Sequence, residues 1–581
     1  MKQIYVICCL LFISLMAQAQ QPQMEWAKQI GDEDGSDIGY SITTDNDGNV
    51  YTTGVFMDTI QIGLNNFVAQ NSDVFVTKQD SAGNYLWAKQ LGGSGQAGSY
   101  SIAVDQFENV FFTGIFSDTI TFPPGPIPQQ FISLGYYDMF ICKLNAAGIL
   151  MWAKHIGDQG YSDWGQNLKL GENGAIYISG YFTDTVDFDP GIGYKPLIAH
   201  GPGDTDAFAL RLDSAGNFVW ASGMGGPGFD AGMGIAVKDD DVYVTGVFDQ
   251  TADFDPGPAT YSLTAPGFAG SANGYVCKLD ALTGNFIWAV QLGDVQQDWC
   301  NNIETDPFGD ILVTGEFTGT VDFDPGAAQY NLTSQAWDIF VWKLSPQGNL
   351  IWAKQLGGAF YDWGNAIAVD DSGSVYTTGF FQDTADFDPG PGVFNLIAGG
   401  YWEVYINKLT TNGDFAWAVA FNGSTVLDLS VNQGWSVAVD NQYNIYTTGQ
   451  FETNCDVDPG PDTLIFSGGC TGCGLGGFYY EDAFIHKMSY STSVGLTETA
   501  FNKTQIRVYP NPVKDNLTII LPKNYATVEL SIFDITGRMI STTNFYDVSE
   551  INQPVNLTPG VYVLQVRTNE GEMRNFKVLK D

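Results

Sequence analysis

Short runs of β-branched and aromatic residues, separated by Gly, Asp and Asn, recur along most of this chain. One run contains Trp-Ala, often followed by Lys, and returns every 61 to 68 residues. The tryptophans that mark it are Trp26, Trp87, Trp152, Trp220, Trp288, Trp352 and Trp417. A unit of this kind cannot bury its apolar face alone, so the period predicts stacked structural repeats.

Each repeat holds four strand-like pieces. They are exemplified by residues 101–105, 375–379, 338–344 and 350–354, which represent the first to fourth strands. Their alternation and the Gly-containing turns between them are typical of antiparallel strands. Four strands in each of seven repeats predict an all-β fold, a seven-bladed β-propeller over residues 24–488.

The register of the repeats predicts how the ring closes. Trp26 begins a fourth-type strand with no first, second or third strand before it, whereas the last repeat, 436–488, has no Trp strand after it. We therefore expect the N-terminal strand to complete the seventh blade.

The connections divide the propeller into two faces. Tight Gly-containing turns, such as 45–49 and 80–84, join first to second and third to fourth strands. The other two connections of each repeat are long and gather on the opposite face, which we call the long-loop face. Binding sites concentrate on such loops.

Charge narrows the range of partners. The chain has 24 Lys plus Arg against 65 Asp plus Glu, a net charge of −41. Such a balance repels nucleic acid and anionic membrane surfaces, suits an extracellular protein and attracts divalent cations. No nucleic-acid partner is expected.

The N-terminus has the features of a secretory signal peptide, residues 1–19. Lys2 precedes the apolar run 4–16, and Ala17-Gln18-Ala19 forms an A-x-A cleavage site. The run is shorter than the roughly 20 residues needed to span a bilayer. No other transmembrane segment is predicted.

The C-terminal part differs in composition. Residues 489–503 are Thr/Ser-rich and polar, as in a linker. Residues 504–581 contain several short strands with turn signals between them, which predicts a small β-sandwich of immunoglobulin-like type.

Two family resemblances follow from these motifs. The repeats, with their Phe-Asp-Pro-Gly, Asp-x-Phe-x-x-Lys-Leu and Gly-Asn-x-x-Trp-Ala phrases, resemble a bacterial β-propeller repeat family that has no common catalytic activity. The C-terminal segment resembles the type A-like sorting domain of type IX secretion cargo. The residues that carry this second resemblance are Tyr509, Pro510, Asn511, Pro512, Gly537, Gly560 and Tyr562.

The second resemblance implies where the protein is located. It implies that the type IX secretion machinery recognises residues 504–581 and exports the protein across the outer membrane of a Gram-negative cell. The protein would then be extracellular, either released or anchored at the outer-membrane surface.

A repeated acidic pair is a candidate calcium site. It precedes Pro-Gly in five repeats, as Asp187 and Asp189, Asp253 and Asp255, Asp322 and Asp324, Asp386 and Asp388, and Asp456 and Asp458. Carboxylates at i and i+2 of an extended segment point the same way, and oxygen ligands suit Ca²⁺. The alternative is that Asp-Pro-Gly is only a turn.

A second acidic position, in the other long loop, is followed by tryptophan in three repeats. These pairs are Asp163 with Trp164, Asp298 with Trp299, and Asp362 with Trp363. Exposed, the rings would form a ligand-binding platform; buried, they would fill the space between blades.

Three cysteines gather in one loop of the seventh repeat. A disulfide from Cys455 to Cys470 or to Cys473 is expected in an oxidising compartment.

The chemistry that is missing favours binding over catalysis. Arg211 is the only arginine before residue 489, and the three histidines occupy unrelated repeat positions. This argues against an arginine cluster, a histidine metal site or a Ser-His-Asp triad. We expect a binding module for a glycan or protein; the alternative is an extracellular polysaccharide hydrolase or lyase that uses acids on the long-loop face.

Overall fold

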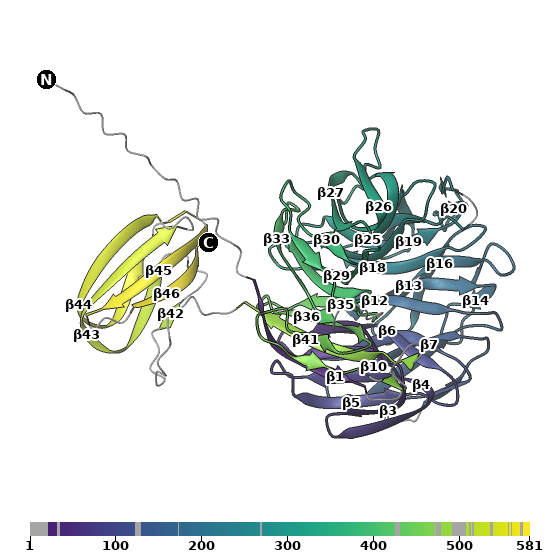
Figure 1. Ribbon diagram of the computed structural model, residues 1–581, viewed down its shortest axis with the longest axis horizontal. Helices are drawn as coiled ribbons and strands as arrows, with labels where there is room; N and C mark the ends of the chain where they lie inside the picture. Colours follow the sequence, from purple (N-terminus) through teal and green to yellow (C-terminus); the bar gives the residue numbers. More distant parts are fainter. Residues whose placement is uncertain are drawn as a thin grey trace. The chain divides into compact units, whose positions relative to one another are not determined.

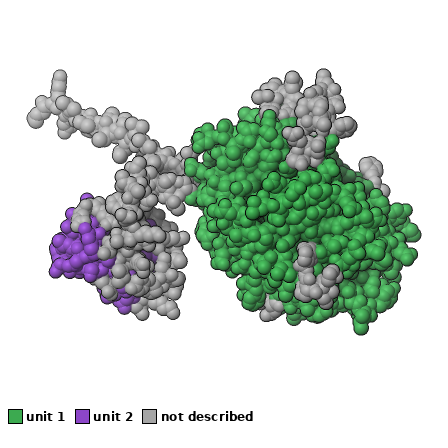
Figure 2. All heavy atoms as spheres, turned by 90° about the horizontal axis from the view of Figure 1, so that it is seen from below, with its two compact units in different colours: residues 1–491 green, residues 492–581 purple. Residues whose placement is uncertain are grey.

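The computed structural model of the chain comprises two compact units, residues 1–491 and 492–581, coloured separately in Figure 2. Within them the structure describes residues 21–31, 35–122, 129–171, 174–267, 270–423, 430–468, 470–471, 478–490, 507–509, 513, 516–534, 538–555, 557–558, 560–569 and 573–580. The expected signal peptide, the expected linker beyond residue 490, and Pro510, Asn511, Pro512, Gly537 and Cys473 lie outside these residues.

The described part of the first unit contains seven blades of four antiparallel strands each, numbered here in chain order; two short strands extend the sheet of blade 5 to six. Blade 1 consists of β2 (Ile38–Thr44), β3 (Val50–Ile62), β4 (Asn65–Gln79) and β5 (Tyr85–Leu91), and blade 2 of β6 (Ala97–Val104), β7 (Val110–Phe116), β10 (Asp138–Leu144) and β11 (Leu150–Ile156). Blade 3 consists of β12 (Trp164–Leu170), β13 (Ile176–Thr183), β16 (Thr205–Leu212) and β17 (Phe218–Met224), and blade 4 of β18 (Ala231–Lys238), β19 (Asp241–Phe248), β22 (Asn273–Asp280) and β23 (Phe286–Leu292). Blade 5 consists of β24 (Trp299–Thr305), β25 (Ile311–Asp322), β26 (Asn331–Leu344) and β27 (Leu350–Gly358), and blade 6 of β28 (Trp363–Val369), β29 (Val375–Phe381), β32 (Glu403–Leu409) and β33 (Phe415–Ala420). Blade 7 consists of β35 (Gln433–Val439), β36 (Ile445–Phe451), β41 (Asp482–Ser489) and β1 (Gln23–Ile30).

The blades are arranged around a common centre (Figure 1). The first strand of each blade contacts the first strand of the next, and β35 of blade 7 contacts β2 of blade 1, so the ring is closed. The apolar core lies between neighbouring blades: Tyr51 and Val76 of blade 1 pack in one cluster with Phe112 and Phe140 of blade 2. The predicted β-propeller fold is confirmed, and the described residues contain no α-helix.

The predicted closure by the N-terminal strand is also confirmed. β1 pairs antiparallel with β41, from Gln23 opposite Ser489 to Ile30 opposite Ala483. Blade 7 therefore joins the two ends of the repeat region in one sheet.

Short outer strands extend the long loops of the described chain. They are β8 (Thr119–Thr121), β9 (Gln130–Ile132), β14 (Thr185–Asp187), β15 (Pro196–Ile198), β20 (Thr251–Asp253), β21 (Ser262–Thr264), β30 (Thr384–Asp386), β31 (Asn395–Ile397), β34 (Asn422–Gly423), β37 (Cys455–Asp456), β38 (Ile465–Phe466), β39 (Cys470–Thr471) and β40 (Phe478–Tyr479). Most of them pair two by two beside their blades.

The repeated tryptophans hold neighbouring blades together. The indole Nε1 of Trp87 donates to the carbonyl of Ala146, 3.0 Å away in the third-to-fourth turn of the next blade. Trp417 has no such turn to reach, because blade 7 takes its fourth strand from the N-terminus. It donates instead to the hydroxyl of Tyr490, at 2.9 Å.

The second unit is described as one five-stranded antiparallel sheet. Its strands are β42 (Arg507–Tyr509), β43 (Asn516–Asp534), β44 (Met539–Pro554), β45 (Gly560–Thr568) and β46 (Met573–Lys580). Leu517, Leu530, Leu564 and Val566 belong to its buried core, and Tyr562 is buried with them. The predicted sandwich of immunoglobulin-like type stays a prediction.

Candidate functional site

A β-bulge in the first strand of every described blade builds the centre of the ring. The register of each first strand against its second strand shifts by one residue at the same place. The residues at the shift are Tyr40, Tyr100, Gln166, Met233, Asn301, Asn365 and Trp435. All seven line one central channel, so the bulge turns one side chain per blade toward the axis.

A glycine in each second strand makes room for the bulge. A Cβ at Gly180 would overlap the carbonyl oxygen of Trp164, and a Cβ at Gly315 would overlap that of Trp299. The same clash recurs at Gly54, Gly114, Gly246, Gly379 and Gly449. Each second strand carries glycine at this position because the bulged backbone of the first strand approaches too closely for any side chain.

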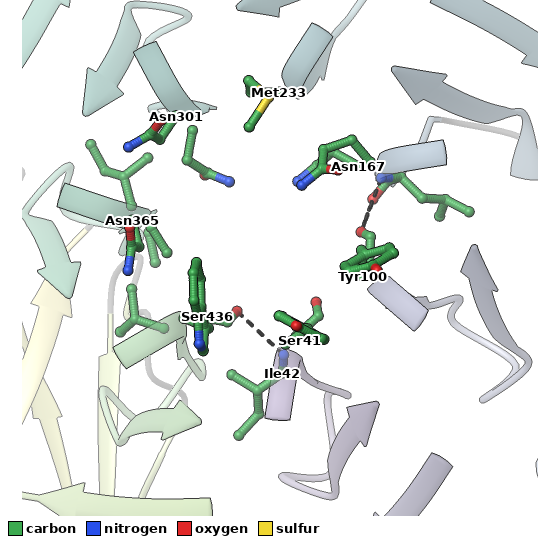
Figure 3. Close-up of a pocket in the computed structure, with 18 of the residues that line it drawn as sticks. Ser41, Ile42, Tyr100, Asn167, Met233, Asn301, Asn365 and Ser436 are labelled. Carbon is green, nitrogen blue, oxygen red and sulfur yellow. Dashed lines mark hydrogen bonds between the residues drawn. The ribbon is translucent and has the colours of Figure 1, made fainter. Parts of the chain in front are cut away.

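The channel is a cavity of about 670 Å³ lined by the first strands of all seven blades. Figure 3 shows Tyr100 and Asn167 on one side of an open centre, with Asn301 and Asn365 across from them. The lining combines hydroxyl and amide groups, aromatic rings and aliphatic side chains such as Ile42 and Leu168. Its one lysine, Lys169, forms an ion pair of 2.5 Å with Glu304 of blade 5, so the lining carries little free charge.

The three tryptophans predicted as a platform all line this channel at its long-loop end. Trp164 is stacked between Tyr100 and Tyr181, at ring-centre distances of 5.0 and 5.6 Å. Trp363 is stacked between Trp337 and Phe380, at 5.9 and 5.3 Å.

The rings extend into an aromatic collar around the mouth. From Trp435 each ring contacts the next through Tyr40, Tyr100, Trp164, Tyr181, Phe229 and Trp299. Because other rings cover both faces of Trp164 and Trp363, these two tryptophans shape the mouth and present edges to it. The three tryptophans thus lie between the two alternatives weighed from the sequence, an open platform and rings buried between blades: they are half-buried in the collar.

The acidic residues before these tryptophans serve the fold. Asp163, Asp298 and Asp362 are at most 3% exposed and do not line the channel. Both oxygens of Asp362 accept backbone N–H groups, of Gly358 at 2.7 Å and of Gln382 at 3.1 Å. Asp163 and Asp298 accept equivalent pairs, which ties the long loop to the end of the second strand.

Burial dominates the titration of these carboxyls. It raises the pKa of Asp163, Asp230 and Asp362 to about 8 and that of Asp298 to about 7, although the backbone N–H groups act in the opposite direction. The folded protein then holds protons that the unfolded chain releases near pH 4. Stability from these groups is therefore present at low pH and lost as the pH rises through about 8.

We expect the melting temperature to fall between pH 7 and pH 9, and to fall less steeply in Asp362→Asn. Above pH 7, His486, whose pKa burial lowers to about 3, is neutral in folded and unfolded chains alike and does not interfere. Self-repulsion of the net charge acts in the same direction, so the variant isolates one proton. Equal slopes in both proteins, measured by calorimetry, would mean that Asp362 is ionised in the folded state.

The five acidic pairs form turns. Oδ1 of Asp253 accepts the N–H groups of Asp255 and Tyr261 at 3.1 and 2.8 Å, and Oδ1 of Asp255 accepts that of Gly257 at 2.8 Å. The same three bonds recur in the other four pairs, which are Asp187 and Asp189, Asp322 and Asp324, Asp386 and Asp388, and Asp456 and Asp458. The backbone of each loop thus supplies the donors that its own carboxylates accept.

The calcium sites expected at these pairs stay a prediction. Within the described residues no three His, Cys, Asp or Glu side chains gather into a metal site. Two carboxylates that already accept backbone N–H groups fall short of the six to eight oxygen ligands of Ca²⁺. The hydrogen bonds agree with the turn alternative, and calcium binding stays a prediction for all ten residues: Asp187, Asp189, Asp253, Asp255, Asp322, Asp324, Asp386, Asp388, Asp456 and Asp458.

The cysteine loop is described only in part. The side chain of Cys455 is buried and has no disulfide partner among the described side chains, and burial raises the pKa of its thiol well above the usual range. The backbone of Cys470 lies in β39, but its side chain and the whole of Cys473 lie outside what the structure describes. The predicted disulfide stays a prediction.

Sequence reasoning missed the bulged residues, which are the main lining of the site. A usable signal was present. The residue after the small one in each first strand changes between aromatic, amide and Met, while the residues on both sides of it stay short in all seven repeats. Variation at one position in an otherwise regular strand indicates a side chain that the fold does not need.

Known family models match part of each of the two units. Residues 507–580 match the secretion system C-terminal sorting domain family. Residues 25–55 and 351–379 match the beta-propeller repeat family. Among the described residues there is no helix with the length and apolarity to cross a membrane.

Curated relatives match over limited parts of their length. An uncharacterized WD repeat-containing protein of Acanthamoeba polyphaga mimivirus is 23% identical over 506 residues, 73% of this chain and 36% of that protein. The regulatory protein FlaEY of Caulobacter vibrioides is 26% identical over 35% of this chain and 20% of its own length. An endo-acting ulvan lyase of Formosa agariphila is 28% identical over 17% of this chain and 19% of its own length. The chain thus spans little more than a third of the first relative and about a fifth of the other two.

Among solved structures, the phage phi92 endosialidase is similar with a TM-score of 0.34 and 9% identity, over 95% of this chain and 87% of that one. The sorting domain places the protein outside the cell or on the outer-membrane surface of a Gram-negative bacterium. The chain is a secreted β-propeller repeat protein with a type IX secretion C-terminal sorting domain.

Proposed function

We propose that this protein is a non-enzymatic extracellular binding module that holds a neutral glycan at the long-loop mouth of its central channel. The observation that carries the proposal is the convergence of seven bulged side chains, one from each blade, on that channel. The fold supplies the bulges, but it does not require the amide and aromatic groups that occupy them.

The chemistry of the lining suits sugars. A sugar offers hydroxyl groups around its edge and a weakly apolar ring face, which match amides and aromatic rings. The lining offers Gln166, Asn167, Asn301, Asn302 and Asn365 with the rings of the collar. Because Lys169 is paired with Glu304 and the protein carries a net charge of −41, an anionic ligand would find little attraction.

A second hollow supports a ligand longer than one sugar. This hollow, about 470 Å³, is bounded by Tyr137, Tyr161, Ser162 and Thr205, and it shares Trp164 and Tyr181 with the channel. A chain of several sugars leaving the channel mouth would pass over these shared rings. We therefore infer an oligosaccharide ligand whose affinity increases with chain length.

The alternative is a polysaccharide hydrolase or lyase, and the partial similarity to an ulvan lyase favours it. Glycoside hydrolysis in its common form uses two carboxyl groups that flank the scissile bond. Of the described residues that line the channel, only Glu304 is a carboxylate, and it is paired with Lys169. This composition supports binding without cleavage, and unchanged sugar length after incubation would agree with it.

The test is titration calorimetry of the mature chain with cellohexaose, mannohexaose and chitohexaose. We expect at least one to bind, and Trp435→Ala and Tyr40→Ala each to weaken that binding about tenfold through lost ring contacts. Phe107→Ala is the matched control, because Phe107 is 70% exposed on a hairpin of the opposite face.

Failure of all three sugars to bind would contradict the glycan proposal. Capture of a protein on the same face would then support the protein-binding alternative. We infer separately that residues 504–581 are the part of the chain that the secretion machinery recognises, which agrees with their match to the sorting domain family.

A further inference from the structure

One buried acid in blade 5 departs from the repeat. In each blade, the second-strand residue opposite the position two before the bulge is Val55, Ile115, Tyr181, Val247, Glu316, Phe380 or Gln450. Five are apolar or aromatic. Glu316 is fully buried, burial raises its pKa well above the usual range, and its Oε1 finds no hydrogen-bond partner among the described residues. An unsatisfied buried carboxyl is costly, so the fold alone does not account for it.

The other oxygen of Glu316 holds a residue of the channel. Oε2 accepts a hydrogen bond of 2.6 Å from Nδ2 of Asn301, the bulged residue of the same blade. The same Nδ2 donates to the carbonyl of Gly364 in blade 6, at 3.1 Å. An amide nitrogen has two protons, so both are engaged and Oδ1 is the atom of this amide left for a ligand.

Blade 7 repeats this arrangement with different residues. Oε1 of Gln450 accepts a hydrogen bond of 2.9 Å from the indole of Trp435, which is again the bulged residue. The position held by Glu316 and Gln450 therefore orients a channel side chain wherever it is polar. Where it is apolar, as at Val55 and Val247, no such bond is made.

We propose that Glu316 is a positioning residue that fixes the amide of Asn301 so that Oδ1 accepts a hydrogen bond from a hydroxyl group of the glycan. The inference rests on the proposed function and narrows it: the sugar at this point must bring a hydroxyl donor. A carboxylate or sulfate group there would face an acceptor oxygen and lack a donor, so acidic sugars are disfavoured.

The test compares Glu316→Val with Glu316→Gln by calorimetric titration with whichever neutral hexasaccharide the wild type binds best. Valine occupies this position in blades 1 and 4, so the first variant fits the fold. We expect Glu316→Val to bind about tenfold more weakly at an unchanged or higher melting temperature. Glu316→Gln still offers Asn301 an acceptor and is expected to stay within about threefold of the wild type. Val55→Ile, at the same position of blade 1, is the matched control and should leave affinity unchanged.

Selectivity provides a readout that a purely structural role would not move. Hexagalacturonate is expected to bind the wild type far more weakly than the neutral hexasaccharide, and Glu316→Val should reduce that difference because Asn301 can then turn its Nδ2 to the channel. Equal affinities of Glu316→Val and wild type, or a lower melting temperature with unchanged selectivity, would overturn the positioning role alone. Absence of any hexasaccharide binding by the wild type would overturn this role together with the glycan proposal.

Discussion

Removing residues 21–30 is expected to unfold the propeller, although it deletes only one strand of blade 7. β1 closes the ring by pairing with β41, and it buries Ile30, which is 1% exposed. The indole of Trp26 reaches the carbonyl of Ser81 in blade 1. Truncation of a buried Ile costs about 2–5 kcal/mol, and the half-buried Trp26 and the pairing with β41 are lost with it, so we expect the loss to exceed about 5 kcal/mol in the free energy of unfolding. Chemical denaturation followed by tryptophan fluorescence measures it.

The ring-closure explanation has its own control. A synthetic peptide of residues 21–31 should restore the melting temperature of the truncated protein, and the same peptide with Trp26→Ala should restore it less. Glu25→Ala should have little effect in the intact chain, because the Glu25 side chain is 42% exposed and the buried Lys487 keeps its hydrogen bond to the carbonyl of Ser81 and its contact with the Tyr446 ring. A truncated protein that melts like the intact one would show that the ring is stable when open.

Gly180→Ala is expected to cost about 3 kcal/mol and to abolish glycan binding. The new Cβ would overlap the carbonyl oxygen of Trp164, and the ring of Phe208 lies 2.8 Å away on the other side. Relief requires the two strands to separate, which removes the bulge and withdraws Gln166 from the channel. Thermal melting and the hexasaccharide titration measure the two effects.

Gly223→Ala is the matched control for this change. Gly223 also lies within a strand of blade 3, but its Cβ would meet only Leu197 and Phe182, at ordinary contact distances of 3.6 Å or more. We expect its melting temperature and affinity to stay close to those of the wild type. Equal effects of the two substitutions would mean that the bulge does not depend on glycine.

The sequence predicted the repeat unit, its four strands and the closing strand, because these depend on local patterns and on counting. The period of Trp26, Trp87 and their equivalents marks every fourth strand. Trp164, Trp299 and Trp363 share a repeat position, and all three line one channel. Their contacts were not predictable, because stacking against Tyr100 or Trp337 depends on how neighbouring blades meet.

The acidic residues show what local spacing alone does not reveal. Carboxylates at i and i+2, such as Asp253 and Asp255, have the spacing of a cation site in an extended strand. The loop instead curls back and supplies their oxygens with its own N–H groups. Only the folded backbone shows that N–H groups of the same loop donate to these carboxylate oxygens.

The contacts of the Lys and Arg side chains in the third strands could not be predicted from the sequence either. Third strands carry Lys or Arg at one position, which belongs to the repeat motif. In the structure Lys143 lies 4.5 Å from the ring centre of Phe111, and Lys408 lies 4.6 Å from that of Tyr376. Each of these pairs lies on facing strands of one blade, blade 2 for Lys143 and blade 6 for Lys408, so part of the scarce positive charge is used inside the propeller.

The pairing of β1 with β41 also sets an order of events. The strand that comes first in the chain must wait for a partner more than 450 residues later, after six blades have formed. Closure over such a separation is slow compared with the hairpins within a blade. In a protein that leaves the cell, both strands must also reach the same side of the membrane before the ring can shut. The unsealed edges of β1 and β41 are therefore the surfaces that a chaperone of the transit compartment would have to protect.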